Sequence, residues 1–394
     1  MRAFTFKGLF LTAVFMLLGC LSIQAADDDL ITKQITIKLD KAGTLPYKIG
    51  SSKKYKITNL KLIGEINGTD WNMIREMAGS DYRGDKTDGN LSVLDLSEAK
   101  IVEGGDKYYY TGGYTSNDQI GSCAFRGCSG LTSLNLPAGI TSIGGYAFYG
   151  CDGLTSLTLP AGITSISAGA FWGCDGLTSL TLPAGITKID YATFWGCSGL
   201  TSLNLPAGIT EIGGSAFYGC RGLTSLNLPA GITKIDYDTF RGCKGLTSLT
   251  LPSSITYISE GAFERCSGLT SLNLPAGITD IGYRAFENCS GLASIYVYAE
   301  KVPRMGNDVF TGCDAKKCIL YVPKGTYDDY WLSDFGYFEN IVEFDATGID
   351  KTTTSTDVEE VSRYSVNGQR LVGPTKGLNI VKYSDGSVKK VAVE

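Results

Sequence analysis

The 394-residue chain contains no histidine. Histidine is the most common general base near neutral pH and the most common neutral metal ligand, so its absence removes the usual centre of many active sites. Carboxylates and lysines remain, but the sequence shows no nucleophile–base pair, phosphate-binding loop or metal-binding cluster. We therefore expect a protein that is not an enzyme and that binds no cofactor or metal.

Basic runs and long apolar segments are also missing. The formal net charge is −5 and the isoelectric point is about 5.1. An acidic chain without a basic patch does not match the phosphate backbone, so we expect no nucleic-acid partner. Beyond the N-terminal segment, no run is long and apolar enough to span a bilayer.

The N-terminus has the pattern of an export signal. Arg2 and Lys7 precede an apolar run at residues 8–18, and small residues lead to a cleavage site after Ala25. The alternative is a lipoprotein signal, because the four residues that end at Cys20 resemble a lipobox, and acylation there would anchor the protein to a membrane. Both interpretations predict a protein that is secreted or held at the cell surface.

A 23-residue phrase fills the middle of the chain, and each copy begins with a cysteine. A fixed period of this length is typical of a solenoid, in which every repeat contributes one turn. The cysteines at the start of the copies are Cys128, Cys151, Cys174, Cys197, Cys220, Cys243, Cys266 and Cys289.

Each copy holds one short strand with alternating side chains. In the first copy Leu134 and Leu136 point one way while Ser133 and Asn135 point the other, and Pro137 ends the strand. Stacked copies lie about 4.8 Å apart, so the strands should form one parallel sheet along one side.

The other side of each copy should be a short helical or irregular turn. Ile140 and Ile143 enter the core from the leg that follows the strand, and Ala147 and Phe148 enter it from the turn. One copy cannot bury this set alone, whereas a stack buries it between neighbours.

The recurring cysteines are predicted to be free thiols packed in the core. Side chains at one position of successive turns are parallel, which suits a disulfide poorly, and the spacing fits no zinc site. Buried cysteine behaves as a small apolar residue. Two close pairs, Cys123/Cys128 and Cys313/Cys318, leave a disulfide open there.

The repeated pattern C-x-x-L-x-x-L-x-L-P-x-x-I-x-x-I-x-x-x-A-F resembles the BspA-like, Treponema-type leucine-rich repeats of bacterial surface proteins. The resemblance covers about residues 120–322, and it departs from common leucine-rich repeats at Gly139, where an Asn or Cys is usual. It implies a secreted or surface-attached binding protein, since some members are adhesins, and it names no ligand.

Irregular segments close the repeat region at both ends. Residues 26–119 should form an N-terminal cap with two degenerate repeats and a helix capped by Asp70. Residues 120–345 should hold the repeats and a C-terminal cap, which includes the amphipathic stretch 326–338. A polar, threonine-rich linker at 346–357 follows.

The last segment, 358–394, is predicted to be a small all-β module. Asn367-Gly368 and Asp385-Gly386 are hairpin turn signals between alternating strands. It resembles the β-sandwich sorting domain at the C-terminus of Bacteroidetes proteins that use type IX secretion, with the closing KKV-x-V strand. The resemblance implies export across the outer membrane and attachment or removal of the module there, whereas a β-module without such a role is the alternative.

Two groups of aromatic residues are candidate partner-binding sites. The residue after the core Phe is aromatic in four successive copies, and a tyrosine-rich loop at 104–119 precedes the first regular copy. The alternatives are rings that only stack on each other and a solvated insertion. The candidate residues are Tyr149, Trp172, Trp195 and Tyr218 in the repeats, and Tyr108, Tyr109, Tyr110 and Tyr114 in the loop.

Two polar rows have simpler interpretations. Ser, Thr and Asn on the outer face of the sheet keep it soluble, although they offer hydrogen bonds to a glycan or a peptide backbone. Lys188, Glu211 and Lys234 alternate in sign on neighbouring copies, which predicts weak pairing between turns.

The sequence thus predicts a leucine-rich-repeat solenoid with one parallel sheet and a small C-terminal all-β module. We expect a non-catalytic protein that mediates adhesion to host or matrix proteins, or contact with another surface protein. One alternative is a carbohydrate-binding protein that uses the aromatic row, and another is a structural spacer.

Overall fold

The structure is a computed structural model that describes residues 30–346, 360–365, 370–371, 376–383 and 388–393. The chain divides into two compact units, with the boundary between Phe344 and Asp345. The expected export signal, nearly all of the expected linker, and both predicted hairpin turns of the last segment lie outside the described residues. None of the described helices has the length and apolar character that a membrane span requires.

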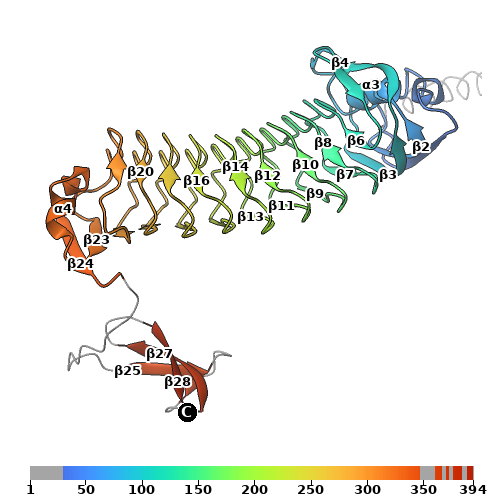
Figure 1. Cartoon of the computed structure of the whole chain (residues 1–394). Coiled ribbons are helices and arrows are strands. Elements are labelled where there is room, and N and C mark those ends of the chain that lie inside the picture. Colours follow the sequence, from blue (N-terminus) through green and yellow to red (C-terminus); the bar gives the residue numbers. More distant parts are fainter. Residues whose placement is uncertain (1–29, 347–359, 366–369, 372–375, 384–387, 394) are drawn as a thin grey trace, which may run out of the picture. The chain divides into compact units, whose positions relative to one another are not determined.

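The first unit is a solenoid whose turns follow each other in register (Figure 1). In most turns one strand pairs in parallel with the equivalent strand of the next, so that Leu180 lies between Leu157 and Leu203, and this pairing is interrupted after residues 135, 204 and 250. This confirms the predicted fold class and the parallel sheet, whose outer surface we call the sheet face. Its strands in the repeats are β7 (Ser133–Asn135), β9 (Ser156–Leu157), β11 (Ser179–Thr181), β13 (Ser202–Asn204), β15 (Ser225–Asn227), β17 (Ser248–Thr250), β19 (Ser271–Leu274), β21 (Ser294–Val297) and β23 (Ile319–Pro323).

A second series of parallel strands, which the sequence did not predict, runs along another side of the solenoid. In most repeats, each of these strands follows the proline that ends the first strand. Each has only two residues, and the second is a buried Ile or a partly buried Met. A strand this short contains no alternation, so its sequence does not distinguish it from a turn. The strands are β6 (Gln119–Ile120), β8 (Ser142–Ile143), β10 (Ser165–Ile166), β12 (Lys188–Ile189), β14 (Glu211–Ile212), β16 (Lys234–Ile235), β18 (Tyr257–Ile258), β20 (Asp280–Ile281) and β22 (Arg304–Met305).

The third side consists of tight turns that place one phenylalanine per repeat in the core. These rings stack on their neighbours from Phe125 to Phe310, with centroid distances between 5.1 and 5.7 Å. All of them are buried, and Phe217 has no exposed surface. Because each ring contacts the rings before and after it, the stack links the turns into one continuous core.

The cysteines of the repeats are free and buried, as predicted, and those from Cys151 to Cys289 each also have a polar contact. The thiol of Cys243 donates a hydrogen bond to the carbonyl of Phe217 at 3.0 Å, and Cys197 donates to Phe171 at 3.1 Å. The members of both close pairs, Cys123/Cys128 and Cys313/Cys318, are free as well. The thiols therefore satisfy carbonyl groups inside the stack, which spacing alone did not reveal.

We predict that these thiols react very slowly in the folded protein. Burial raises the pKa of Cys197 and of Cys243 to about 12, so the reactive thiolate is scarce at pH 8. A chromogenic disulfide reagent should label the seven cysteines from Cys151 to Cys289 at rates about a thousandfold below that of free cysteine. All should react quickly in urea, and a fast phase of several thiols in the native protein would contradict the packing.

The N-terminal cap extends the sheet with longer strands and packs a helix, through Trp71, against Phe125 at the start of the phenylalanine stack. Strands β1 (Ile35–Leu39), β2 (Asn59–Ile66) and β3 (Val93–Ile101) are parallel, and β3 pairs with β7. A short helix, α2 (Leu45–Lys48), and a longer one, α3 (Gly68–Met77), complete the cap.

Asp70 stabilises this cap in a way that differs from the prediction. The N-cap of α3 is Asn67, and Asp70 lies one turn later as the second partner of a capping box. The buried Asp70 carboxylate accepts hydrogen bonds from the backbone N–H groups of Gly43, Leu45 and Asn67, at 2.6, 2.9 and 3.0 Å. It thereby joins α3 to the segment that leads into α2, a contact 25 or more residues away that local sequence does not reveal.

Replacing Asp70 by alanine should destabilise the first unit by about 2–3 kcal/mol, because three buried or half-buried donors lose a charged acceptor. Asp70→Ala is compared with Asp88→Ala, which changes an exposed aspartate of the same cap and should alter stability by less than about 0.5 kcal/mol. Urea unfolding followed by circular dichroism measures both. Equal midpoints for the two variants would rule out the capping role.

The C-terminal cap closes the other end of the solenoid. After β23 the chain forms α4 (Tyr327–Trp331), a 3-10 helix at Asp334–Tyr337 and an edge strand, β24 (Asn340–Phe344). Phe335 and Phe338 are buried against Phe310, the last ring of the stack, and the buried Tyr330 packs on Phe335. The amphipathic stretch predicted to cover the core does so.

The second unit, considered by itself, is a small antiparallel sheet. Its strands are β25 (Glu360–Ser365), β26 (Arg370–Leu371), β27 (Gly377–Tyr383) and β28 (Val388–Val393), in the order β26-β25-β27-β28. The described residues form this single sheet, which agrees with the predicted all-β module. The sorting role of this unit stays a prediction.

Candidate functional site

The four aromatic residues that follow the core Phe form a stack on the turn side. The ring of Trp172 lies 4.5 Å from that of Trp195 with an interplanar angle of 13°, and Trp195 lies 4.1 Å from Tyr218 at 16°. Tyr149 is tilted against Trp172 at 5.8 Å. All four side chains are half-buried. The sequence prediction that these residues align is therefore met, and we call them the aromatic ladder.

Arginines lie at both ends of the aromatic ladder. The guanidinium of Arg126 is 4.1 Å from the ring centroid of Tyr149, and that of Arg241 is 5.9 Å from Tyr218. The faces of Trp172 and Trp195 are occupied by neighbouring rings, so the ring edges remain for a partner. Stacking of a sugar on these faces would require the ladder to open.

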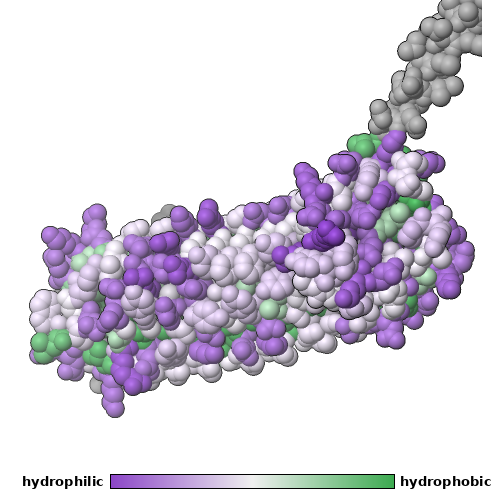
Figure 2. All heavy atoms as spheres, turned by 90° about the horizontal axis from the view of Figure 1, so that it is seen from above, coloured by the Kyte–Doolittle hydropathy of each residue, from purple (hydrophilic) through white to green (hydrophobic). Residues whose placement is uncertain are grey.

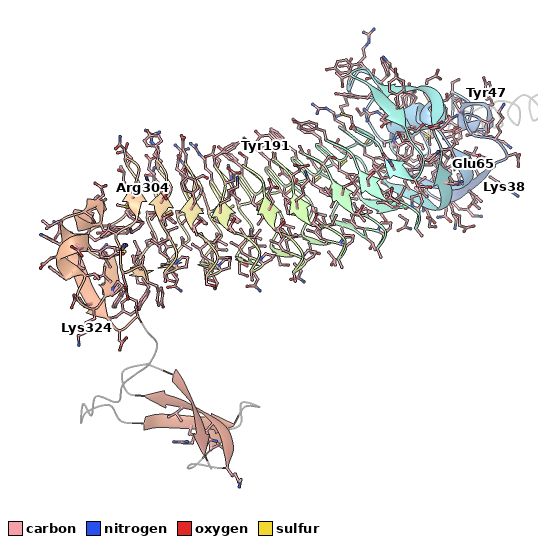
Figure 3. All side chains as sticks on the ribbon, viewed as in Figure 1. Lys38, Tyr47, Glu65, Tyr191, Arg304 and Lys324 are labelled. Atoms are coloured by element: carbon pink, nitrogen blue, oxygen red, sulfur yellow. The ribbon has the colours of Figure 1, made fainter. Side chains whose placement is uncertain are left out.

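Exposed tyrosines that the sequence analysis did not select lie on the same turns. Tyr191 and Tyr237 are 38% and 47% exposed, and their ring centroids are 6.3 Å apart. They belong to repeats on either side of Gly214, where a Cβ atom would lie 2.5 Å from Cζ of Tyr237. Figure 3 shows Tyr191 pointing outward from the edge of the solenoid. A tyrosine three positions before the core Phe in some copies, and a glycine at the same position in the copy between them, was the available signal.

Tyr146 lies against the N-terminal end of the ladder. Its ring lies 6.1 Å from Trp172 and 6.2 Å from Tyr149. We refer to the aromatic ladder together with these three tyrosines as the aromatic corner. Its members are Tyr146, Tyr149, Trp172, Trp195, Tyr218, Tyr191 and Tyr237.

The tyrosine-rich segment is a hairpin and not an open loop. Strands β4 (Gly104–Tyr109) and β5 (Gly113–Thr115) pair antiparallel and pack on α3. Tyr108 and Tyr109 are buried, and Tyr108 donates a hydrogen bond to the carbonyl of Ser122 at 3.0 Å. This corrects the prediction that all four tyrosines are available to a partner.

The two remaining tyrosines of the hairpin are accessible. Tyr110 is 53% exposed and Tyr114 is 54% exposed, and the Lys107 ammonium lies 5.4 Å from the Tyr114 ring. They are far fewer than the rings of the aromatic corner, so the hairpin is the smaller of the two surfaces.

The charged row on the second strand series pairs within turns. Lys188 lies 3.4 Å from Asp190, and Lys234 lies 2.9 Å from Asp236, two residues along the same turn. The predicted bridges to Glu211 are not among the ion pairs of the described residues. A lysine reaches the aspartate of its own turn more readily because backbone geometry already places the two together.

Charged residues replace the aromatic ladder in the repeats that follow Arg241. Glu264 accepts from Arg241 at 2.8 Å and lies 3.3 Å from Arg265, while Arg284 lies 3.2 Å from Glu287. Burial raises the pKa of the Glu264 carboxyl above its usual value, although the neighbouring arginines oppose this shift. Asp238 also pairs with Arg241 at 3.2 Å, so the cluster of three arginines and three carboxylates has no net formal charge, and it bounds the aromatic corner on its C-terminal side.

The surface around the corner is weakly polar. Figure 2 looks onto the edge of the solenoid that carries Tyr191, and much of the surface over the repeats is pale, between hydrophilic and hydrophobic. Deeper purple gathers over the N-terminal cap. In the described part of the chain, no group of three or more metal-binding side chains occurs.

The repeat segment of the chain is similar to a known family of repeats. The family model described as a BspA type leucine-rich repeat region, with six copies, matches residues 118–247 and 210–324. The two stretches together span more than half of the chain. A comparison with curated proteins finds no match.

Several solved structures are similar to this chain. A leucine-rich repeat protein of T. pallidum is 33% identical over 39% of this chain and 72% of its own, with a TM-score of 0.38. One from Bacteroides ovatus is 23% identical over 79% of this chain and 92% of its own, with a TM-score of 0.32. The pneumococcal vaccine antigen PcpA is 17% identical over 81% and 90%, with a TM-score of 0.41.

The stacked turns and the repeat model lead to the same conclusion. The model covers the segment in which each turn buries its Cys, Leu, Ile and Phe at equivalent positions. The chain belongs to the BspA-type leucine-rich repeat family.

Proposed function

We propose that this chain is a non-catalytic, exported surface protein that binds a protein partner through the aromatic corner. The observation that supports the proposal most is the row of half-buried rings with exposed tyrosines beside it and an arginine at each end. Tyr, Trp and Arg are the residues that contribute most often to the binding energy of protein interfaces. The partner is a host or matrix protein or another surface protein.

Preorganisation favours binding at this corner. The rings are already held by their neighbours along the stack, so little side-chain entropy is lost when a partner covers their edges. The charges next to the outer tyrosines are already paired within their own turns, Lys188 with Asp190 and Lys234 with Asp236. Membrane attachment, through Cys20 acylation or through the C-terminal module, is a separate prediction.

The test measures binding of residues 26–394 to immobilised fibronectin, fibrinogen and a panel of polysaccharides. Tyr191→Ser combined with Tyr237→Ser removes two exposed rings without opening the core, and it should weaken protein binding by about tenfold or more. Tyr257→Ser is the matched control, because Tyr257 is 42% exposed but lies on the second strand series.

A second variant addresses the ladder itself. Trp172→Ala combined with Trp195→Ala should abolish protein binding while the solenoid stays folded, which circular dichroism verifies. Saturable protein binding that is unchanged in both double variants would refute the proposal. A folded protein that binds nothing would favour a structural spacer instead.

A further inference from the structure

On the sheet face, the row of outward side chains that begins with Asn135 changes character at its C-terminal end. From Asn135 to Asn273 it contains only short Asn and Thr side chains. The next strands place Tyr296 and then Tyr321 in the same row, followed by Val342 of the edge strand. The sequence pattern of the repeats does not require this change, because Tyr296 occupies a position that points away from the core.

The rings of these strands form an ordered group. Tyr296 stacks on Tyr321 with a centroid distance of 4.3 Å and an interplanar angle of 3°. Phe344 meets Tyr296 edge-on at 5.8 Å and 90°, and it meets Tyr298 at 5.2 Å and 89°. The group is only partly buried, and Tyr298 is 36% exposed.

The two faces of the Tyr296 ring have different surroundings. One face is covered by Tyr321, while the other is turned toward the turn that carries Asn273. Asn273 is exposed, and its side chain is too short to cover a tyrosine ring that projects from the adjacent strand. The ring therefore forms a wall above a lower polar floor.

The floor consists of uncharged hydrogen-bonding groups. Ser271 and Asn273 lie next to the wall, and Ser248 and Thr250 occupy the same positions one turn further away. Ser248, Thr250 and Asn273 are exposed, and Ser271 is partly exposed. Hydroxyl and amide groups at the spacing of successive turns offer donors and acceptors along the solenoid axis.

We propose that this wall and floor bind a neutral glycan, with one pyranose ring stacked on the free face of Tyr296. The negative face of an aromatic ring attracts the weakly positive C–H groups of a sugar, and the floor supplies partners for its hydroxyls. An uncharged floor favours a neutral sugar over an acidic one, because no cation is present on it to compensate a carboxylate or sulfate. The site is separate from the aromatic corner and adds a second binding activity to the proposed function.

A substitution that the repeats themselves supply tests this site. Tyr296→Asn places at this position the residue found in the same row at Asn135, Asn204, Asn227 and Asn273, so the fold should tolerate it. Affinity electrophoresis of the exported chain is run through gels that contain a neutral glucan, a mannan or a galactan, and a gel with polygalacturonate as the acidic comparison.

The expected result is retardation by at least one neutral polysaccharide, with an apparent affinity about tenfold lower for Tyr296→Asn. The Tyr191→Ser/Tyr237→Ser variant should be retarded like the unchanged chain, which separates this site from the protein-binding surface. Absence of retardation in all neutral gels, or equal retardation of Tyr296→Asn, overturns the proposal. Loss of protein binding in Tyr296→Asn without any glycan binding would assign the wall to a protein contact and overturn it as well.

Discussion

Replacing Phe217 by alanine should destabilise the solenoid by about 3–5 kcal/mol. The ring has no exposed surface and stacks on Phe194 at 5.5 Å and on Phe240 at 5.4 Å. Its removal leaves a cavity between two rings that cannot close it, because each is held by the stack on its other side. In a solenoid the loss falls on the interfaces with both neighbouring turns.

Urea unfolding measures this effect. Phe217→Leu keeps most of the volume and should lose less than about 2 kcal/mol, which separates the cavity from the change of residue type. A broader transition is also expected for Phe217→Ala, since the weakened turn divides the solenoid into two parts. If the free energy of unfolding of Phe217→Ala lies within about 1 kcal/mol of that of the unchanged chain, the stack is not the main source of stability.

Replacing Arg75 by methionine should cost about 3–5 kcal/mol, because the side chain is buried and joins the N-terminal cap to the first repeat. Its Nη1 atom donates to the carbonyls of Cys123 and Ala124 at 2.7 and 3.2 Å. Its Nη2 atom donates to the hydroxyl of Ser80 and the carbonyl of Asp81, both at 3.0 Å. Methionine fills the space but leaves these acceptors without the charged donor.

The position of the tyrosine hairpin gives this prediction a second measurement. The Arg75 guanidinium lies 5.1 Å from the ring of Tyr109, so its loss should also loosen the hairpin. Hydrogen exchange in residues 104–115 should accelerate in Arg75→Met and remain unchanged in Arg83→Met, which alters an exposed arginine of the same cap. Unchanged exchange in Arg75→Met, with unchanged stability, would contradict the role of this residue.

The repeats could be read from the sequence because every structural position recurs at the same spacing. Leu134, Ile143, Phe148 and Cys151 are buried as predicted, and the parallel sheet follows from that periodicity. The second strand series could not be identified, because a two-residue strand such as Ser142–Ile143 has no pattern of its own. Its pairing results from the stacking of turns and not from local preference.

The caps were less predictable because their contacts join residues that are distant in sequence. Asp70 and Arg75 bind backbone groups 25 to 49 residues away. Tyr108 and Tyr109 resemble exposed loop residues in sequence, yet α3 covers them once the hairpin folds back on it. Burial of this kind depends on tertiary packing, which composition does not encode.

The aromatic row was identified from the sequence, but its environment was not. Alignment of the copies places Trp172 and Trp195 on neighbouring turns, whereas stacking of their faces depends on side-chain rotamers. Tyr191 and Tyr237 were missed because they occur only in alternate repeats, with Gly214 between them. A search for residues that recur in every second copy of the 23-residue repeat would have revealed them.

The most direct test of the proposed function is hydroxyl-radical footprinting of the folded chain with and without a bound protein partner. Aromatic side chains react readily, so each ring reports its own accessibility. We expect Tyr191, Tyr237, Trp172 and Trp195 to become protected on binding, while Tyr257 remains as reactive as before. Protection confined to Tyr257 or to the sheet face, with these four rings unchanged, would contradict the assignment of the aromatic corner as the protein-binding surface.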